Sequence, residues 1–218
     1  MNTGRNHIFQ QIITAILAGK ADLVLKSVSS GLAMNISAME IMEYAIMPAT
    51  KQLAVKFQGA DFYIPDVLLA SRAIKAGLYA LKPLIQTNSR CLKKIVIGTV
   101  AGDIHDIGKN MVSLFLSFSG FEVIDLGVDV TAVEFVQAVK KYRPSLLGLS
   151  ALLTTTIGEM GVVIEQLNRN HLRHTVKILV GGAPVTKEFA AFIGADAYAQ
   201  DAQEAVKLAR ELVRQDQP

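Results

Sequence analysis

The sequence predicts an α/β protein in which an N-terminal helical bundle caps a C-terminal, doubly wound parallel sheet of five strands. Up to about residue 88 the apolar residues recur at helical spacing. From residue 91, short β-branched runs alternate with helical segments, as they do in parallel sheets. Apolar residues make up 51% of the 218 residues and charged residues 19%, so the chain can bury ordinary cores.

The N-terminal half is expected to form a bundle of four or five helices. Gly19 separates the first helical run from the second. Ser37 lies three residues before Glu40, a capping-box pattern that opens a helix through Met47, and Pro48 either disturbs this helix or starts the next. The apolar positions expected in the bundle core are Ile8, Ile12, Ile16, Leu17, Leu23, Leu25, Val28, Leu68, Leu69, Ile74, Leu78 and Leu81.

The C-terminal half is expected to form a Rossmann- or flavodoxin-like sheet with right-handed crossovers. Its strands are predicted at 95–100, 122–126, 145–150 and 176–180, with a weaker fifth at 195–198. Its helices are predicted at 107–119, 131–142, 157–168, 186–193 and 201–214. With a linker near residues 87–90, the predicted domains are 1–88 and 91–218.

Composition excludes several classes of function. The formal net charge is only +3 and the basic residues are scattered, so nucleic acid is not an expected partner. Cys91 is the single cysteine, which fits a reducing compartment. No apolar run approaches the roughly 20 residues that span a bilayer, and the N-terminus lacks a signal-peptide pattern. We therefore expect a cytoplasmic protein with no membrane partner.

The loop after the first predicted strand carries the most informative residues. It has neither the Gly-x-Gly-x-x-Gly of dinucleotide folds nor a P-loop, but it contains Asp103, His105, Asp106 and Gly108. A neutral imidazole can bind a metal through one nitrogen while its other N–H donates to a carboxylate such as Asp103. The alternatives are that Asp106 only caps a helix and His105 is an ordinary loop residue, or that zinc or iron binds with further ligands.

Two further strand ends are expected at the same sheet edge. The third strand ends in Ser150-Ala151-Leu152-Leu153-Thr154-Thr155-Thr156 and the fourth in Gly181-Gly182-Ala183-Pro184. Hydroxyls and small residues together suit a deep slot for a long polar group. Glycines and hydroxyls are also common in strand-to-helix turns, so each feature alone is a weak signal.

With these segments, the sequence resembles the cobalamin-binding module of corrinoid methyltransferase proteins, including the corrinoid subunits of methanogen and acetogen systems and the B12 region of methionine synthase. The resemblance covers nearly the whole chain and extends to residues 120–129 and 182–186. Its markers are Asp103-x-His105-x-x-Gly108, Ser150-x-Leu152 and Gly181-Gly182.

The resemblance implies cobalamin as cofactor, with His105 replacing its dimethylbenzimidazole as the lower axial ligand of cobalt. Asp103 is expected to hydrogen-bond His105, and Thr156 to complete a relay with them. The displaced nucleotide tail is expected in a slot between Ser150, Leu152, Thr154, Gly181 and Gly182. The further expected cofactor contacts are Gly102, Asp106, Ile107, Gly108, Ala183, Tyr198 and Asp201.

The resemblance also gives the helical half a function. Phe57, Ile64 and Val67 match positions at which methionine synthase covers the upper face of the corrin. An apolar lid there is expected to keep water from the cobalt. The alternative is that these residues belong to the bundle core.

A methyl carrier is the function that the resemblance implies. Cob(I)alamin takes a methyl group from a substrate-specific methyltransferase, and methylcobalamin yields it to a corrinoid:tetrahydrofolate methyltransferase or one that uses a related pterin. A reductive activase is a further expected partner, and the carrier has no complete activity alone. The alternatives are a B12-dependent sensor or regulator, the small subunit of an adenosylcobalamin mutase, and a corrinoid-free structural module.

Overall fold

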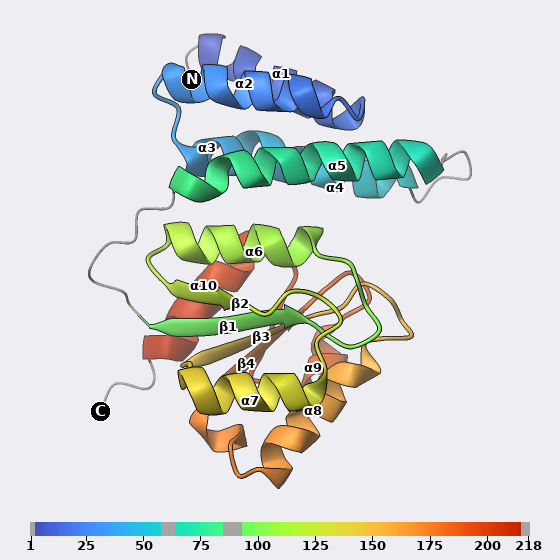
Figure 1. Cartoon of the computed structure of the whole chain (residues 1–218), viewed down its shortest axis with the longest axis vertical. Coiled ribbons are helices and arrows are strands. Elements are labelled where there is room, and N and C mark those ends of the chain that lie inside the picture. Colours follow the sequence, from blue (N-terminus) through green and yellow to red (C-terminus); the bar gives the residue numbers. More distant parts are fainter. Residues whose placement is uncertain (1–2, 58–63, 85–92, 215–218) are drawn as a thin grey trace. The chain divides into compact units, whose positions relative to one another are not determined.

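The computed structural model of the protein describes residues 3–57, 64–84 and 93–214. The chain divides into two compact units, Met1–Ile85 and Gln86–Pro218 (Figure 1). Among the described residues, no helix has the length and apolar character needed to cross a bilayer.

The first unit is helical, as the sequence predicts. Its elements are α1 (Thr3–Leu17), α2 (Ala21–Ala33), α3 (Ala38–Ile41), the π-helical turn η1 (Met42–Ile46), α4 (Met47–Phe57), α5 (Ile64–Leu81) and the 3-10 turn η2 (Lys82–Leu84). The expected core positions Ile12, Ile16, Ile74 and Leu81 are fully buried.

Four leucines expected in this core are instead exposed. Val24, Val28 and Gly31 line the buried face of α2, four and three residues apart, which leaves Leu23 and Leu25 on its outer side. In α5, Ala70, Ala73 and Ile74 are buried, whereas Leu68 and Leu69 are 65% and 47% exposed. The prediction was wrong at these four positions because other residues, such as Val24 in α2 and Ile74 in α5, form the buried faces of the two helices.

Pro48 disturbs the helix, which is one of the two predicted alternatives. The capping box is present, since Ser37 Oγ accepts from the Glu40 N–H at 3.1 Å and the Glu40 carboxylate accepts from the Ser37 N–H at 2.9 Å. The helix then widens into η1, where the Met47 N–H donates to the Met42 carbonyl five residues back. Proline has no N–H to donate, and a π-helical turn lets the backbone continue past it into α4.

The second unit alternates strands and helices. Its elements are β1 (Lys94–Thr99), α6 (Ile107–Phe118), β2 (Glu122–Asp125), α7 (Ala132–Tyr142), β3 (Leu146–Ser150), α8 (Gly158–Arg169), η3 (Arg173–Thr175), β4 (Lys177–Gly181), α9 (Lys187–Ile193), β5 (Ala197–Ala199) and α10 (Ala202–Arg214). All pairings are parallel and the strand order is β2-β1-β3-β4-β5, which confirms the predicted sheet.

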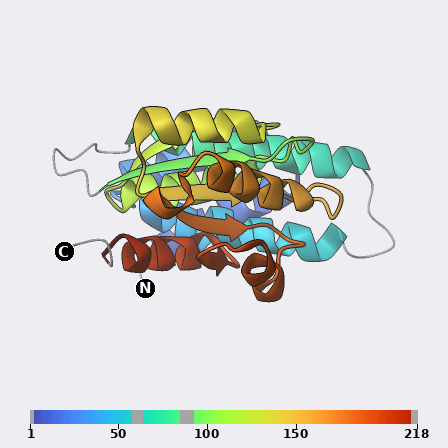
Figure 2. The ribbon, with the colours of Figure 1, turned by 90° about the horizontal axis from the view of Figure 1, so that it is seen from below.

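Alternate residues of the strands feed two cores, one on each face of the sheet. Val96 packs in a core with residues of α7, α8 and α9, such as Phe135 and Met160. Its neighbour Ile95 packs in a core with α6 and α10, through residues such as Leu116 and Ala209. Figure 2 shows the strands lying between α7 and α10.

The loops that follow β1, β3 and β4 meet at the carboxyl edge of the sheet. Thr99 pairs with Ser150, and Ser150 pairs with Gly181, so the three strand ends are neighbours. In open α/β sheets, ligands bind beyond this edge, at the point where the chain order reverses. Here the reversal lies between β1 and β3, and this is the site of the loop with His105.

Candidate functional site

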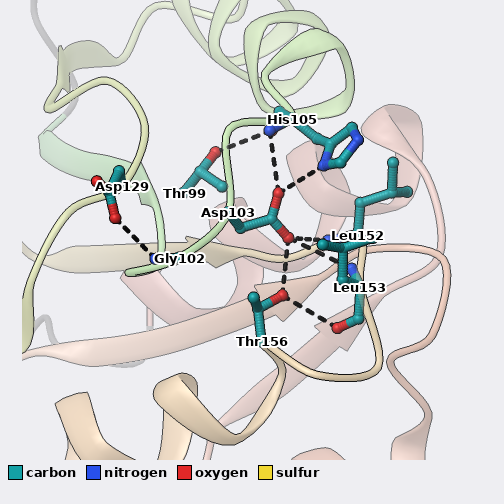
Figure 3. A network of polar contacts seen from close by, with 8 residues as sticks. All are labelled: Thr99, Gly102, Asp103, His105, Asp129, Leu152, Leu153 and Thr156. Atoms are coloured by element: carbon teal, nitrogen blue, oxygen red, sulfur yellow. Dashed lines mark hydrogen bonds and ion pairs between the residues drawn. The ribbon is translucent and has the colours of Figure 1, made fainter.

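The Asp103 carboxylate is the centre of a hydrogen-bond network in the β1–α6 loop (Figure 3). Its Oδ1 accepts from the backbone N–H of His105 at 3.0 Å and lies 2.7 Å from Nδ1 of the same residue. Its Oδ2 accepts from the backbone N–H groups of Leu152 and Leu153 at 2.7 and 3.3 Å, and from the Thr156 hydroxyl at 2.8 Å. Asp103 is fully buried, so these donors replace water completely.

The same network sets the charge of Asp103. Burial by itself raises the pKa of this carboxyl group. The hydrogen bonds from the backbone of His105 and Leu152, and from the side chains of His105 and Thr156, outweigh burial and hold the pKa well below its ordinary value. Asp103 is therefore an anion at neutral pH.

An anionic acceptor at Nδ1 fixes the state of the His105 ring. Because the carboxylate can only accept, we assign the proton of the neutral imidazole to Nδ1, which leaves a lone pair on Nε2. Nε2 has no hydrogen-bond partner among the residues that the structure describes, and the side chain is 45% exposed. The ring therefore presents one free nitrogen donor to a ligand.

Further contacts hold the backbone of this loop. The buried Thr99 hydroxyl donates to the His105 carbonyl at 3.1 Å. From the β2–α7 loop, Asp129 Oδ1 accepts from the Gly102 N–H at 2.7 Å, and the Asp129 N–H donates to the Asp103 carbonyl at 3.0 Å. Sequence reasoning missed both residues, although Thr99 ends β1 and Asp129 lies in the loop after β2, at the same edge.

Exposed aliphatic side chains belong to the loops that converge on Asp103. Ile104 is 73% exposed, and Val128, Leu152 and Leu153 are also exposed. Apolar side chains gathered around a single nitrogen donor favour a large, partly apolar metal complex over a bare ion. Consistently, the described part of the chain holds no group of three or more His, Cys, Asp or Glu side chains that could bind a metal ion, which counts against the zinc or iron alternative.

The ends of β3 and β4 approach each other closely. The Ala151 N–H donates to the Gly181 carbonyl at 3.3 Å. Gly182 has φ of +138°, and a Cβ at this position would lie 1.8 Å from the Ala151 carbonyl oxygen. Only glycine allows this approach, which sets the position of the β3–α8 loop and of the N–H groups that bind Asp103.

Comparisons with known proteins identify the family. A family model described as a B12 binding domain matches residues 93–207, and a second model with the same description matches residues 8–82. The dimethylamine corrinoid protein 1 of Methanosarcina acetivorans is 40% identical over 211 residues, which cover 96% of this chain and 99% of that protein. The chain belongs to the corrinoid proteins of methyltransferase systems.

Solved structures of corrinoid proteins share its fold. The monomethylamine corrinoid protein of Methanosarcina barkeri matches with a TM-score of 0.85 and 33% identity, over 94% of this chain and 98% of that one. A chain of the methanol:cobalamin methyltransferase complex of the same organism matches with a TM-score of 0.55 and 26% identity, over 95% of this chain and 80% of that one.

The site of this corrinoid protein fits cobalamin, the cofactor expected from the sequence. Cobalamin would bring the ring nitrogens that hold its cobalt, so the protein would need to add only one donor. His105 Nε2 is such a donor, with its tautomer fixed by Asp103. Next to it, a Cβ at Gly108 would meet nothing within 4 Å, so the start of α6 faces open space.

Both predicted contacts of Asp103, with His105 and with Thr156, are present in the corrinoid protein. The alternative that Asp106 caps α6 is not found. Asp106 stands at the N-cap position, but its side chain makes no cap bond. Its Oδ2 instead accepts from Asn110 Nδ2 at 3.2 Å. Cobalt ligation by His105 stays a prediction, as do the cofactor contacts of Gly102, Ile107, Ser150, Leu152, Thr154 and Ala183.

Tyr198 and Asp201 have structural contacts of their own. Tyr198 lies in β5 opposite Val180 and packs against the core beneath α7, α8 and α9. Asp201 Oδ1 accepts from the N–H groups of Gln203 and Glu204, at 3.1 and 3.0 Å, and so caps α10. Their contact with the cofactor stays a prediction.

The predicted lid residues belong to the helical unit. Val67 is half-buried in α5. The side chains of Phe57 and Ile64 lie outside the described residues, as does the whole of 58–63. Shielding of the upper face of the cofactor by these three residues stays a prediction.

Proposed function

We propose that this chain carries cobalamin with His105 Nε2 as the lower axial ligand of cobalt, and that it carries methyl groups between two methyltransferases. The contact between Asp103 and His105 is the observation that supports ligation, because it leaves a single, oriented lone pair at the protein surface. When bound, cobalamin supplies the cobalt that accepts and releases the methyl group.

The chain's own residues position this donor. Asp103 keeps the proton on Nδ1 and stabilises the ring in one orientation, while Leu152, Leu153 and Thr156 hold the carboxylate in place. The exposed side chain of Ile104, beside His105, offers apolar surface to the corrin ring. We place the nucleotide tail near Gly181 and Gly182 on the resemblance alone, because a Cβ at these glycines would meet the carbonyl oxygens of Ala199 and Ala151.

The names of the relatives indicate the methyl donor. A dimethylamine corrinoid protein is 40% identical over almost the whole chain, and the monomethylamine corrinoid protein shares the fold. We therefore propose a methylamine-specific methyltransferase as the first partner. The proposed second partner transfers the methyl group to tetrahydrofolate or a related pterin, and a reductive activase returns inactive cobalt to the cycle.

Ligation is tested by reconstituting the purified chain with cobalamin under reducing conditions and recording the electron paramagnetic resonance of Co(II). We expect nitrogen hyperfine splitting from imidazole, which His105→Ala abolishes. His171→Ala, at an exposed histidine remote in sequence from the motif, is the matched control and should leave the splitting unchanged. A chain that binds no cobalamin, or splitting that persists in His105→Ala, would contradict the proposal.

The carrier function is tested with the reconstituted chain, a dimethylamine-specific methyltransferase and a corrinoid:tetrahydrofolate methyltransferase. We expect methyltetrahydrofolate to form only when all three proteins and the methylamine are present. Demethylation of dimethylamine without transfer to the pterin would overturn the proposed acceptor and leave the proposed donor standing.

A further inference from the structure

Lys109 is a buried lysine that the site described above does not use. It is the third residue of α6 and is only 3% exposed. Its ammonium donates to Asp125 Oδ1 at 2.7 Å and to Asn110 Oδ1 at 2.8 Å. A lysine is rarely buried so deeply without a counter-charge. Moving an unpaired ammonium group out of water costs roughly several kcal/mol of free energy.

One series of contacts leads from Lys109 to the backbone of the cobalt ligand. The same Asp125 oxygen accepts from the Gly127 N–H at 2.9 Å. The Gly127 carbonyl accepts from the Thr99 N–H at 3.0 Å. The Thr99 hydroxyl in turn donates to the His105 carbonyl at 3.1 Å. The ion pair thus fixes Gly127, at the start of the β2–α7 loop. Gly127 holds the backbone of Thr99 at the end of β1, and the Thr99 hydroxyl bonds to His105.

A second series reaches the residue that follows His105. Asn110, whose side-chain oxygen accepts from Lys109, donates through Nδ2 to Asp106 Oδ2 at 3.2 Å. The Asn110 N–H also donates to the Asp106 carbonyl at 2.8 Å. The carbonyl of His105 and the residue that follows it are therefore held by contacts that lead back to one ammonium group, and none of these contacts passes through Asp103.

We propose that Lys109 is a positioning residue for cobalt ligation by His105. Asp103 sets the tautomer and the tilt of the imidazole, whereas the Lys109–Asp125 ion pair sets where the loop backbone places the ring. The inference rests on the proposed function, because it assumes that His105 is the axial ligand. Residues that orient a metal ligand from behind commonly change metal affinity about 10- to 100-fold when they are removed.

The test compares the ratio of imidazole-ligated to unligated Co(II), measured by electron paramagnetic resonance, at equal amounts of bound cobalamin. In Lys109→Met we expect this ratio to fall about 10-fold, because the loop loses its anchor while the cofactor contacts stay. Lys140→Met is the matched control. Lys140 is exposed and donates to Asn170 Oδ1 at 2.8 Å, so its removal should leave the ratio unchanged.

A double variant separates positioning from stability. Asp125→Asn alone leaves a buried ammonium without its counter-charge, since the side chain of Lys109 is 2% exposed and that of Asp125 is 35% exposed. We expect it to melt at the lowest temperature of the series. Lys109→Met/Asp125→Asn removes both charges, so the melting temperature should recover while the ligation ratio stays low. A ratio that recovers together with the melting temperature would assign Lys109 to stability alone and overturn the inference.

Failure of the inference differs from failure of the proposed function. If the natural chain shows no imidazole splitting, the proposed function fails and the inference fails with it. If the natural chain shows the splitting and both the Lys109→Met and the double variant keep its ratio, only the positioning function of Lys109 is overturned.

Discussion

Asp103 and His105 meet at the boundary between the core and solvent. The carboxylate is fully buried, the imidazole side chain is 45% exposed, and Nδ1 lies 2.7 Å from Oδ1. The hydrogen bond therefore joins a carboxylate that is held in the core to an imidazole that is open to solvent. Because the inner end is fixed by donors from the β3–α8 loop, the outer nitrogen has a defined direction before any cofactor binds.

Asp103→Asn should destabilise the protein. The amide keeps the size of the side chain, but it turns one of two accepting oxygens into a donor that faces other N–H or O–H groups. Leaving these buried donors unsatisfied costs about 2 kcal/mol, to be measured as the free energy of unfolding in urea. Asp129→Asn is the control: among the described residues only Oδ1 of Asp129 accepts, from Gly102, and the amide oxygen can keep this bond, so little change is expected. Equal losses in both variants would contradict this account.

The stability of the protein should fall in acid partly through Asp103. Its pKa in the folded state is held below the unfolded value of about 3.9, so the ionised group stabilises the fold above that pH. This stabilisation is lost as the pH falls below about 4 toward the lowered pKa.

Urea unfolding between about pH 5 and pH 3 should therefore show a shallower pH dependence in Asp103→Asn than in the natural chain. Glu134→Gln is a useful comparison. The pKa of Glu134 is also lowered, through hydrogen bonds with Thr131, but this carboxylate is exposed and should change the slope less. An unchanged slope in Asp103→Asn would contradict the assigned pKa direction.

Removing the Thr156 hydroxyl should weaken the network from its far side. Thr156→Val keeps the shape but withdraws the donor from Asp103 Oδ2, and we expect a loss of about 1 kcal/mol in the free energy of unfolding. The pKa of Asp103 should rise at the same time. Thr156→Ser keeps the hydroxyl and should restore the Asp103 pKa, as followed by the carboxyl carbon signal in NMR. If Thr156→Ser raises the pKa of Asp103 as much as Thr156→Val does, the hydroxyl is not sufficient to lower this pKa and the account is contradicted.

Gly182→Ala should be the most damaging methyl addition at the sheet edge. The new Cβ would lie 1.8 Å from the Ala151 carbonyl oxygen, and φ of +138° is strained for any side chain. We expect a loss of about 3 kcal/mol, measured by urea unfolding. Gly158→Ala is the control, because a Cβ at the start of α8 meets nothing within 4 Å, and its stability should be equal or slightly higher. A tolerated Gly182→Ala would mean that the β3–α8 loop moves freely.

The sequence predicted what depends on side-chain identity and strand order. Asp103 and His105 were recognisable because their types suit a metal ligand and its acceptor, whereas Thr156 was assigned through the family resemblance. The backbone N–H groups of Leu152 and Leu153 were not recognisable, because every residue carries such a group. Lys109 was missed because its residue type gave the wrong expectation. Lysine is expected at surfaces, and only the fold shows that this one pairs with Asp125 in the interior.

The donors to Asp103 Oδ2 come from residues 49 to 53 positions later in the chain. A ribosome-bound fragment that ends within α6 therefore already contains Asp103 and His105 but lacks the groups that hold the Asp103 carboxylate in place. If His105 binds cobalt as proposed, its full positioning would require β3 to pair with β1. The visible spectrum and the electron paramagnetic resonance of bound cobalamin would thus report that the sheet has folded completely. A partly synthesised or misfolded chain would lack these signals.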